Sequence, residues 1–142
     1  MNMENLRPFI EARIKAQVAE FKEVEGASDL QNITANRLSD PGCYVFSESV
    51  FVTPNTVIGK TMQQVTLTFA VVIVLKNVKD ARGSDAADVS NTLQESVRTA
   101  LLGWQPHSVA DPMEYAGGTL VSFSNGFFIW RESYRTIQYI RS

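Results

Sequence analysis

The sequence predicts an α+β fold with a mostly antiparallel sheet of long strands. Apolar residues at helical spacing open the chain and return after residue 84. Between these segments, residues 61–76 alternate between apolar and polar side chains, which is typical of a long strand. Near the C-terminus, Asn125-Gly126 predicts a β-hairpin, since both residues accept the positive φ of a tight turn. We therefore expect two main helices and one short helix packed on one face of the sheet.

The first helix is expected to start after Asn5, a plausible N-cap, and to stop at Gly26. Pro8 fits its first turn, where the missing N–H loses no helical bond. One face of this helix is apolar, formed by Leu6, Phe9, Ile10, Ile14, Val18 and Phe21. The short helix is expected from Ser28 or Asp29, before a turn at residues 40–42.

The next segment predicts two strands of unequal length. Residues 44–46 form a short strand, and residues 47–60 are expected to be irregular because they include Pro54, Asn55 and Gly59. The long strand at 61–76 gains apolar residues on its second face towards its end. We therefore predict that the start of this strand is exposed to solvent on one face and that both faces are covered near its end.

The third helix is expected to begin with Ser84 as N-cap and to end at Gly103, with Pro106 preventing its continuation. Its predicted buried stripe consists of Ala86, Val89, Leu93, Val97, Ala100 and Leu101. Strands are predicted at 119–124 and 127–140. The apolar parity changes along the second of these, which predicts a bulge or twist near Arg131.

Length and composition predict one ordinary globular domain over residues 1–142. A net charge of −2 gives no basis for bulk attraction to nucleic acid or a membrane. Cys43 is the one cysteine, so no intramolecular disulfide can form, which fits assembly in a reducing cytoplasm. The N-terminus lacks an apolar signal core, and the longest apolar run, at 69–75, is too short for a membrane helix. We expect a soluble, unexported protein with no membrane partner.

The sequence offers no catalytic, metal-binding or cofactor-binding residues. His107 is the one histidine and lies in a proline-flanked loop, so nucleophilic triads and the usual zinc sites are unsupported. Gly59-Lys60-Thr61 resembles the end of a phosphate-binding loop, but Pro54 occupies the place of its first glycine. Carboxylates far apart in sequence could still meet, so a small enzyme or ligand-binding domain is the alternative from a different class.

Two apolar features are candidates for protein contacts. The Val50-Phe51-Val52 group falls in the expected irregular segment, where exposed apolar side chains often mark partner surfaces. Its other interpretation is a strand or a group tucked under the loop. Trp104, just past the helix stop, could fill the core or anchor an interface.

Basic residues form a weak signal. Lys76, Lys79 and Arg82 cluster around one connection, and three arginines lie along the last strand: Arg131, Arg135 and Arg141. Strand arginines commonly make ion pairs on a solvated face. The cluster is compatible with a lining that only lets DNA pass, without sequence-specific binding.

In its order of features the chain resembles the tail terminator-like proteins of long-tailed bacteriophages, also called minor tail or tail completion proteins. Four passages carry the likeness: the amphipathic opening at 6–14, the strand at 41–46, the long strand at 64–74, and the helix end at 97–106. The last of these is the most specific, with Leu102-Gly103-Trp104 followed two residues later by Pro106.

The resemblance implies a structural subunit of a ring, typically a hexamer, at the head-proximal end of the tail tube. Such a ring stops tube growth, meets the head connector and lets DNA through its centre; it implies a virion tail protein with no catalytic residue. A neck, connector or tube-like component is the alternative within the virion. The residues expected at subunit contacts are Val50, Phe51, Val52, Ile58, Lys79, Arg82 and Trp104, and those expected to face DNA are Lys76, Lys79 and Arg82.

Overall fold

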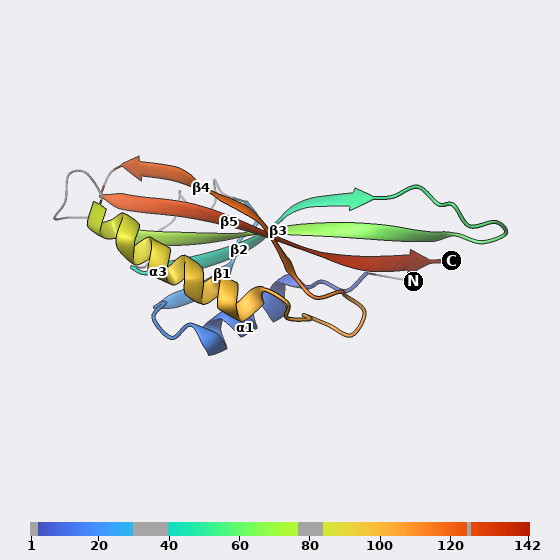
Figure 1. Ribbon diagram of the computed structural model, residues 1–142, viewed down its shortest axis with the longest axis horizontal. Coiled ribbons are helices and arrows are strands. Elements are labelled where there is room, and N and C mark those ends of the chain that lie inside the picture. Colours follow the sequence, from blue (N-terminus) through green and yellow to red (C-terminus); the bar gives the residue numbers. More distant parts are fainter. Residues whose placement is uncertain (1–2, 30–39, 77–83, 125) are drawn as a thin grey trace.

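A computed structural model describes residues 3–29, 40–76, 84–124 and 126–142 of the chain. Two helices and five strands are present in these ranges (Figure 1). They follow in the order α1 (Arg7–Gln17), β1 (Glu23–Gly26), β2 (Gly42–Val52), β3 (Met62–Lys76), α3 (Ser84–Leu101), β4 (Glu114–Ser124) and β5 (Phe127–Arg141). The strands form one sheet in the order β1-β2-β3-β5-β4, in which only the β1–β2 pair is parallel. The prediction of an α+β fold with a mostly antiparallel sheet is confirmed.

The first helix is shorter than predicted, because the chain after it joins the sheet. α1 ends at Gln17, and Gly26, the predicted stop, lies in β1, where it pairs with Val45 of β2. Asn5 does not cap the helix, since Leu6 holds the N-cap position and makes no side-chain cap bond. Proline in the first turn is confirmed. The predicted short helix falls largely on residues 30–39, outside the described ranges.

The segment predicted to be irregular is partly a strand. β2 runs on through residues 47–52, because β3 offers it a full antiparallel partner from Val74 down to Val65. A register shift between Ser47 and Ser49 makes room for Glu48 as a bulge. The long strand is confirmed in β3, and burial does extend to both faces along its second half.

The helix α3 matches its predicted range, but its buried stripe differs at three positions. Gly103 takes φ +76, the left-handed conformation expected where the helix stops. Val89, predicted to be buried, is 51% exposed. Ser90 and Gln94 are buried instead, and the Gln94 side chain donates a 3.0 Å hydrogen bond to Ser90 Oγ. Val89 was predicted to be buried because it is apolar. Two polar residues can occupy the inner face of the helix instead when they form a hydrogen bond with each other.

The bulge predicted in the last strand is found on its neighbour. β5 pairs with β3 along its whole length without a register shift. The shifts lie in β4, between Tyr115 and Gly117 and between Leu120 and Ser122. β4 also starts at Glu114, earlier than the predicted 119. The ends of the two strands pair at Ser124 and Phe127, and Gly126 takes φ +79; Asn125 is outside the described ranges.

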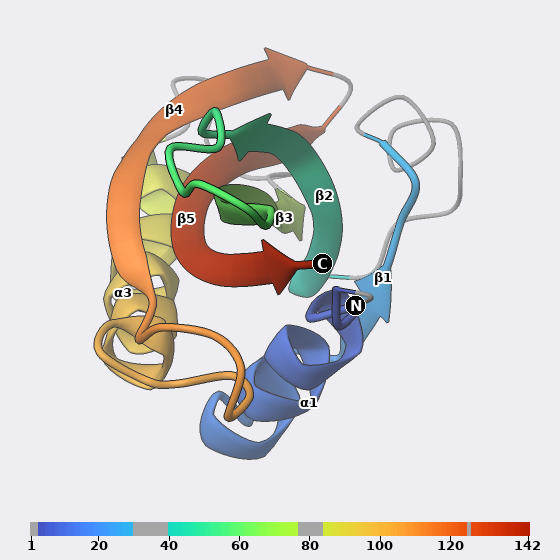
Figure 2. The same cartoon turned by 90° about the vertical axis from the view of Figure 1, so that its right-hand side faces the viewer.

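The sheet is strongly curled, with α1 and α3 on one side of it (Figure 2). The main core lies between the helices and this helix-facing side of the sheet, and contains Ile10, Ile14, Val71, Ile73 and Val97. A second, smaller cluster on the outer side contains Tyr44, Phe46, Ala70, Val72, Val74 and Ile129. Both helices therefore pack on one face, as predicted, and they cover only part of the sheet's length (Figure 1).

Candidate subunit interface

Residues 47–64, which we call the arm, extend the sheet beyond the helices. They comprise the end of β2, the loop at 53–61 and the start of β3, and they lie at the right-hand end of the molecule in Figure 1. Every residue of β2 from Ser47 to Val52 is exposed, whereas the strand's first five residues are buried. The change coincides with the Glu48 bulge and with the limit of the helix layer.

The arm presents four large apolar side chains to solvent. The exposed fractions are 52% for Val50, 66% for Phe51, 40% for Val52 and 97% for Ile58. All four were predicted at subunit contacts from the sequence. A group of this kind, concentrated in one place, is what marks a protein-binding surface, while single exposed apolar residues do not.

The two faces of the arm are both apolar. Val50 pairs with Leu67, and Val52 with Val65, both of which belong to the helix-facing core. Phe51 pairs with Thr66 and therefore points to the outer side. The apolar face of the core thus continues onto β2 without a covering layer, and Phe51 adds an apolar side chain on the opposite face.

The loop at the tip of the arm is held by its own hydrogen bonds. The Asn55 side chain donates to the carbonyl oxygens of Val57 and Lys60, at 3.1 and 3.0 Å, and accepts from the Val57 and Met62 amides. Gly59 takes φ +82, and Thr61 exchanges hydrogen bonds with Ser142 at the end of β5. Ile58 is therefore displayed on an ordered loop, which limits the entropy lost when a partner binds.

Glu48 fixes the bulge from which the arm starts. Its carboxylate reaches across the outer side of β3 and forms an ion pair with Arg131 of β5. It also accepts a 3.0 Å hydrogen bond from Ser133 Oγ. The Arg131 guanidinium lies 5.5 Å from the ring centre of Phe46. This cluster sets the direction in which β2 leaves the covered part of the sheet.

The remaining predicted contact residues lie elsewhere. Trp104 is partly buried against the main core and therefore fills its edge. The Arg13 guanidinium lies over the indole ring, 5.4 Å from the ring centre of Trp104. Lys76 is exposed at the end of β3 opposite the arm, and its amide donates to Asp40 Oδ1 at 3.0 Å. Lys79 and Arg82 are outside the described ranges. The structure thus groups the four arm residues and separates them from Trp104 and Lys76.

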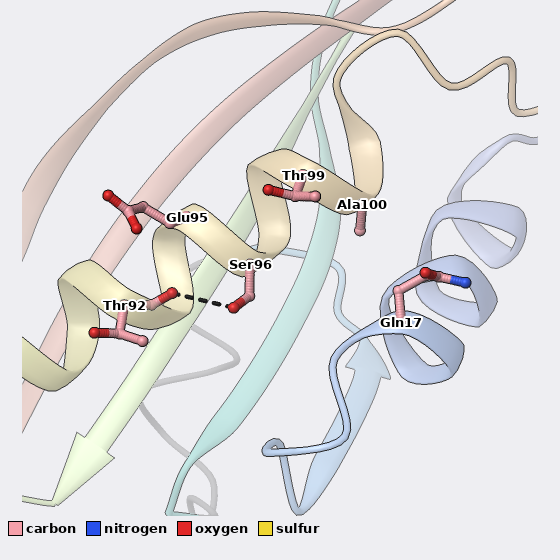
Figure 3. A pocket seen from close by; sticks show the side chains of 6 residues that line it. All are labelled: Gln17, Thr92, Glu95, Ser96, Thr99 and Ala100. Atoms are coloured by element: carbon pink, nitrogen blue, oxygen red, sulfur yellow. Dashed lines mark hydrogen bonds between the residues drawn. The ribbon is translucent and has the colours of Figure 1, made fainter.

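An open groove of about 310 Å³ lies between the two helices (Figure 3). Its lining is polar and mostly neutral, from Gln17, Thr92, Glu95, Ser96, Thr99 and Ala100. Thr92 and Ser96 hydroxyls both bond to carbonyl oxygens one helical turn earlier. With one carboxylate and no histidine or cysteine, the lining contains neither a nucleophile with its base nor an acid–base pair.

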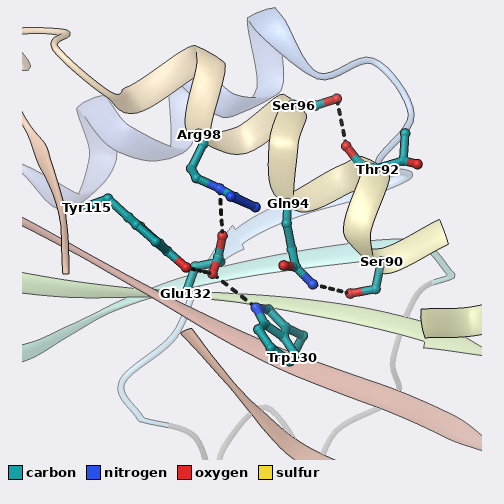
Figure 4. A network of polar contacts seen from close by, with 8 residues as sticks. All are labelled: Ser90, Thr92, Gln94, Ser96, Arg98, Tyr115, Trp130 and Glu132. Carbon is teal, nitrogen blue, oxygen red and sulfur yellow. Dashed lines mark hydrogen bonds and ion pairs between the residues drawn. The ribbon is translucent and has the colours of Figure 1, made fainter. Parts of the chain in front are cut away.

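A buried carboxylate network under β4 was missed by the sequence analysis (Figure 4). Glu132 is fully buried; its Oε2 accepts hydrogen bonds from Tyr115 Oη at 2.7 Å and Trp130 Nε1 at 3.0 Å. Its Oε1 lies 3.6 Å from Arg98 Nε of α3. Its place between Trp130 and Tyr134 in the alternating pattern was the available signal, because that parity faces inward.

The network is structural in its geometry. A Cβ at Gly118 would clash with Glu132 Oε2, so the backbone of β4 closes directly over the carboxylate. Burial and the hydrogen bond to Glu132 raise the pKa of Tyr115 to about 12. Burial also raises the pKa of Tyr134, whose hydroxyl is buried without a hydrogen-bond partner in the described residues. Tyr115 and Tyr134 are therefore neutral at neutral pH. They surround the Glu132 carboxylate, whose ion pair with Arg98 connects α3 to the sheet.

The two residues that sequence analysis tested for chemistry are also held in structural places. Cys43 is fully buried in the main core, and burial raises the pKa of its thiol, which is therefore protonated at neutral pH. His107 packs edge-on against Phe9, and its Nδ1 accepts a hydrogen bond from the Val109 amide. Among the described residues, no three His, Cys, Asp or Glu side chains gather as metal ligands. Of the two described helices, neither has the length and apolar character to cross a membrane.

Comparison with known protein families assigns the chain to a family. The family model for the phage tail terminator protein matches residues 5–142, nearly the whole chain. The chain belongs to the phage tail terminator family. The resemblance drawn from the four sequence passages is thereby confirmed. A search of curated proteins found no match.

Phage tail terminators are structural proteins and not enzymes, in agreement with the prediction from the sequence. Membership makes this chain a component of the virion tail. Since such a component acts by contacting other head and tail proteins, the surface that needs explaining is an assembly surface. In the described residues the arm is the region where large exposed apolar side chains concentrate along one segment.

Proposed function

We propose that the protein is a subunit of a ring, expected to be hexameric, that caps the head-proximal end of the tail tube. The ring stops tube polymerisation and offers its other face to the head connector. The observation that carries this proposal is the arm of this chain. Its ordered segment exposes four large apolar side chains that no helix covers: Val50, Phe51, Val52 and Ile58. A free monomer has no use for such a surface, whereas a ring subunit buries it.

A closed ring requires each subunit to present two different surfaces, one to each neighbour. An arm that projects from one end of a compact, helix-covered body provides one surface, and the body of the next subunit provides the other. Burying the three β2 side chains and Ile58 supplies a hydrophobic contribution of about 1.5 to 3 kcal/mol for each side chain fully covered. The contact is hydrophobic, so it tolerates the salt of the cytoplasm where assembly is expected.

DNA would pass through the centre of this ring without sequence-specific binding. Lys76 is exposed at the end of β3, and Lys79 and Arg82 follow it in sequence. A lining that only passes DNA needs few positive charges, because a tight grip on the phosphates would hinder ejection. These three residues are our candidates for that lining.

Tail length is the decisive measurement. In a phage carrying Phe51→Asp or Ile58→Asp, a charge enters the arm surface, and we expect overlong tubes by electron microscopy. Val89→Asp on α3 is the matched control, because Val89 is a similarly exposed apolar residue outside the arm. Normal tail lengths in both arm variants would contradict the proposal. Tails of normal length that fail to join heads would instead support a neck or connector role.

A further inference from the structure

Along the arm, no strand of the described residues pairs with the outer edge of β2. β1 pairs with β2 only as far as Gly26 opposite Val45, and within the described ranges no strand continues beyond it. The Thr53 amide donates to Gln64 of β3 at 2.9 Å, so alternate residues of β2 bond towards β3. Val50 and Val52 therefore direct their backbone N–H and C=O groups to the free edge. Such an edge is complementary to one structure, another extended strand.

The same chain offers a second free edge on β4, the strand at the other side of the sheet. From Tyr115 to Ser124 this strand carries no charged residue, and no proline. Proteins commonly protect exposed edges with lysine, proline or inward charges. The two bulges of β4 interrupt its edge, but residues 117–120 between them pair with β5 without a register shift, and Gly117 takes φ +118. On β2, residues 49–52 likewise pair with β3 without a register shift.

The two edges also match in direction. β2, β3, β5 and β4 follow one another in antiparallel steps, so β4 runs opposite to β2. Two copies placed side by side in the same orientation would therefore bring β2 of one against β4 of the other as an antiparallel pair. Antiparallel pairing is slightly the more stable arrangement.

Side chains complete the match on each face of the sheet. Phe51 faces the outer side, and Gly117 pairs with Ser133, opposite Ala70 of the outer cluster. A Cβ at Gly117 would meet nothing within 4 Å, so this side of β4 is open. An aromatic side chain laid across a glycine on a neighbouring strand is a stabilising cross-strand arrangement.

On the helix-facing side, the same alignment places Val50 opposite Gly118. Leu120, which is 47% exposed, then lies diagonally from Val50, within reach of an apolar contact. One register therefore pairs residues 49–51 of β2 with residues 119–117 of β4, each on the same face of the sheet. The larger side chains of Val50 and Phe51 then lie opposite the two glycines of β4.

We propose that the arm of one subunit adds to the sheet of a second copy of this chain, with β2 at 49–51 paired antiparallel to β4 at 117–119. Phe51 then faces Gly117, and Ser49 faces Thr119. This inference rests on the proposed ring in that it names the contact between neighbouring subunits. Head-to-tail repetition of the one contact covers both free edges of every subunit and can close a ring.

Cysteine cross-linking between copies tests the register. In Ser49→Cys/Thr119→Cys protein, the two side chains lie three strand spacings apart within one chain, and they are aligned with residues 68 and 72 of β3, four residues apart along that strand. Their separation therefore exceeds about 14 Å, too far for an internal disulfide. Across the proposed pair their Cβ atoms would be about 5 Å apart, which permits one. We expect covalent dimers and a ladder of higher species under mild oxidation. Ser49→Cys/Val89→Cys is the matched control and should stay monomeric on a denaturing gel.

Hydrogen exchange on the unmodified protein gives a second readout that needs no folding of a variant. On going from dilute to assembled protein, the Val50 amide should gain at least about tenfold protection, because it enters a strand ladder opposite Gly118. The Phe51 amide, already directed to β3, should change little.

The outcomes separate this contact from the proposed function. If solution mass shows rings, but there is no cross-link and no added protection at Val50, the strand pairing is overturned and the proposed ring is not. Cross-linked copies with normal tail lengths in the Phe51→Asp phage support the pairing and overturn tube capping. A protein that shows neither cross-links nor added protection at any concentration overturns the pairing, and tail length then decides the proposed function by itself.

Discussion

The covered half of the sheet and the arm use the same strands for different purposes. In the covered half, β3 from Phe69 to Leu75 is buried on both sides, between the helices and the outer cluster. In the arm, β2 is exposed on both faces and along one edge, and the order of the tip depends on hydrogen bonds from Asn55 and Ser142. Apolar side chains occur in both regions. In the first they stabilise the fold, and in the second they are available for a partner.

This difference predicts that stability and assembly can be altered separately. A substitution in the covered half should lower the free energy of unfolding and affect assembly only through folding. A substitution in the arm should leave the isolated protein as stable as before. The following variants test that separation, beginning with the largest expected effect.

Ile73→Ala should destabilise the protein by about 4 kcal/mol, because it leaves a cavity in the main core where the side chain is fully buried. Urea unfolding followed by circular dichroism measures this change. Ile58→Ala is the control at the tip of the arm and should stay within about 0.5 kcal/mol of wild type. Equal costs for the two variants would show that the arm is part of the stabilising core.

Glu132→Ala should cost about 3 kcal/mol, because it leaves the buried donors of Tyr115 and Trp130 and the Arg98 guanidinium without their carboxylate. Glu48→Ala removes a partly exposed carboxylate from the outer side, and we expect it to cost about 1 kcal/mol or less. Denaturant midpoints of the two variants give the comparison. If Glu48→Ala proved the costlier, the arm's anchor and not the buried network would dominate stability.

Tyr115→Phe should cost about 1.5 kcal/mol at neutral pH through loss of its hydrogen bond to Glu132. The folded protein raises the pKa of Tyr115 from 10 to about 12, so the stabilisation belongs to the protonated hydroxyl. It is fully present below pH 10 and is lost as the pH rises through about 12. The difference between wild type and variant in unfolding free energy should therefore shrink over this window. A difference independent of pH up to 12 would contradict the assignment.

Asn55→Ala should have the smallest effect on global stability, about 0.5 kcal/mol or less, because the loop it organises is exposed. Its local effect should be larger. Faster hydrogen exchange at the Val57 and Met62 amides, which Asn55 Oδ1 accepts from, is the expected result. Unchanged exchange there would mean that pairing of β2 with β3 is enough to order the tip.

Much of the fold could be predicted because it depends on local pattern. The alternation through 61–76 gave β3, the apolar spacing after Ser84 gave α3, and Gly103 gave its stop through left-handed backbone geometry. The errors arose where pairing between distant segments prevailed over local preference. Gly26 was expected to end a helix, but it lies in β1 and pairs with β2. Residues 47–52 were expected to be irregular because loop residues follow them, but they form part of β2 because they pair with β3.

The candidate site divides in the same way. The apolar character of Val50, Phe51, Val52 and Ile58 is a property of the sequence, and it marked them as contact residues. Their exposure is not, because it follows from helices that end before the sheet does. The buried Glu132 network likewise depends on α3 bringing Arg98 to β5.

The sequence by itself determined the class of fold, the long central strand, the main helix and the family, since each follows from the spacing of side chains along one segment or from their order along the chain. Tertiary structure decided which apolar residues became core and which became surface, where the bulges fell, and which two strands form the edges of the sheet that no other described strand pairs with. The physical reason is that burial and edge pairing are properties of neighbours brought together by folding. A residue's chemistry sets what it can contact, and the packed layers set what it does contact.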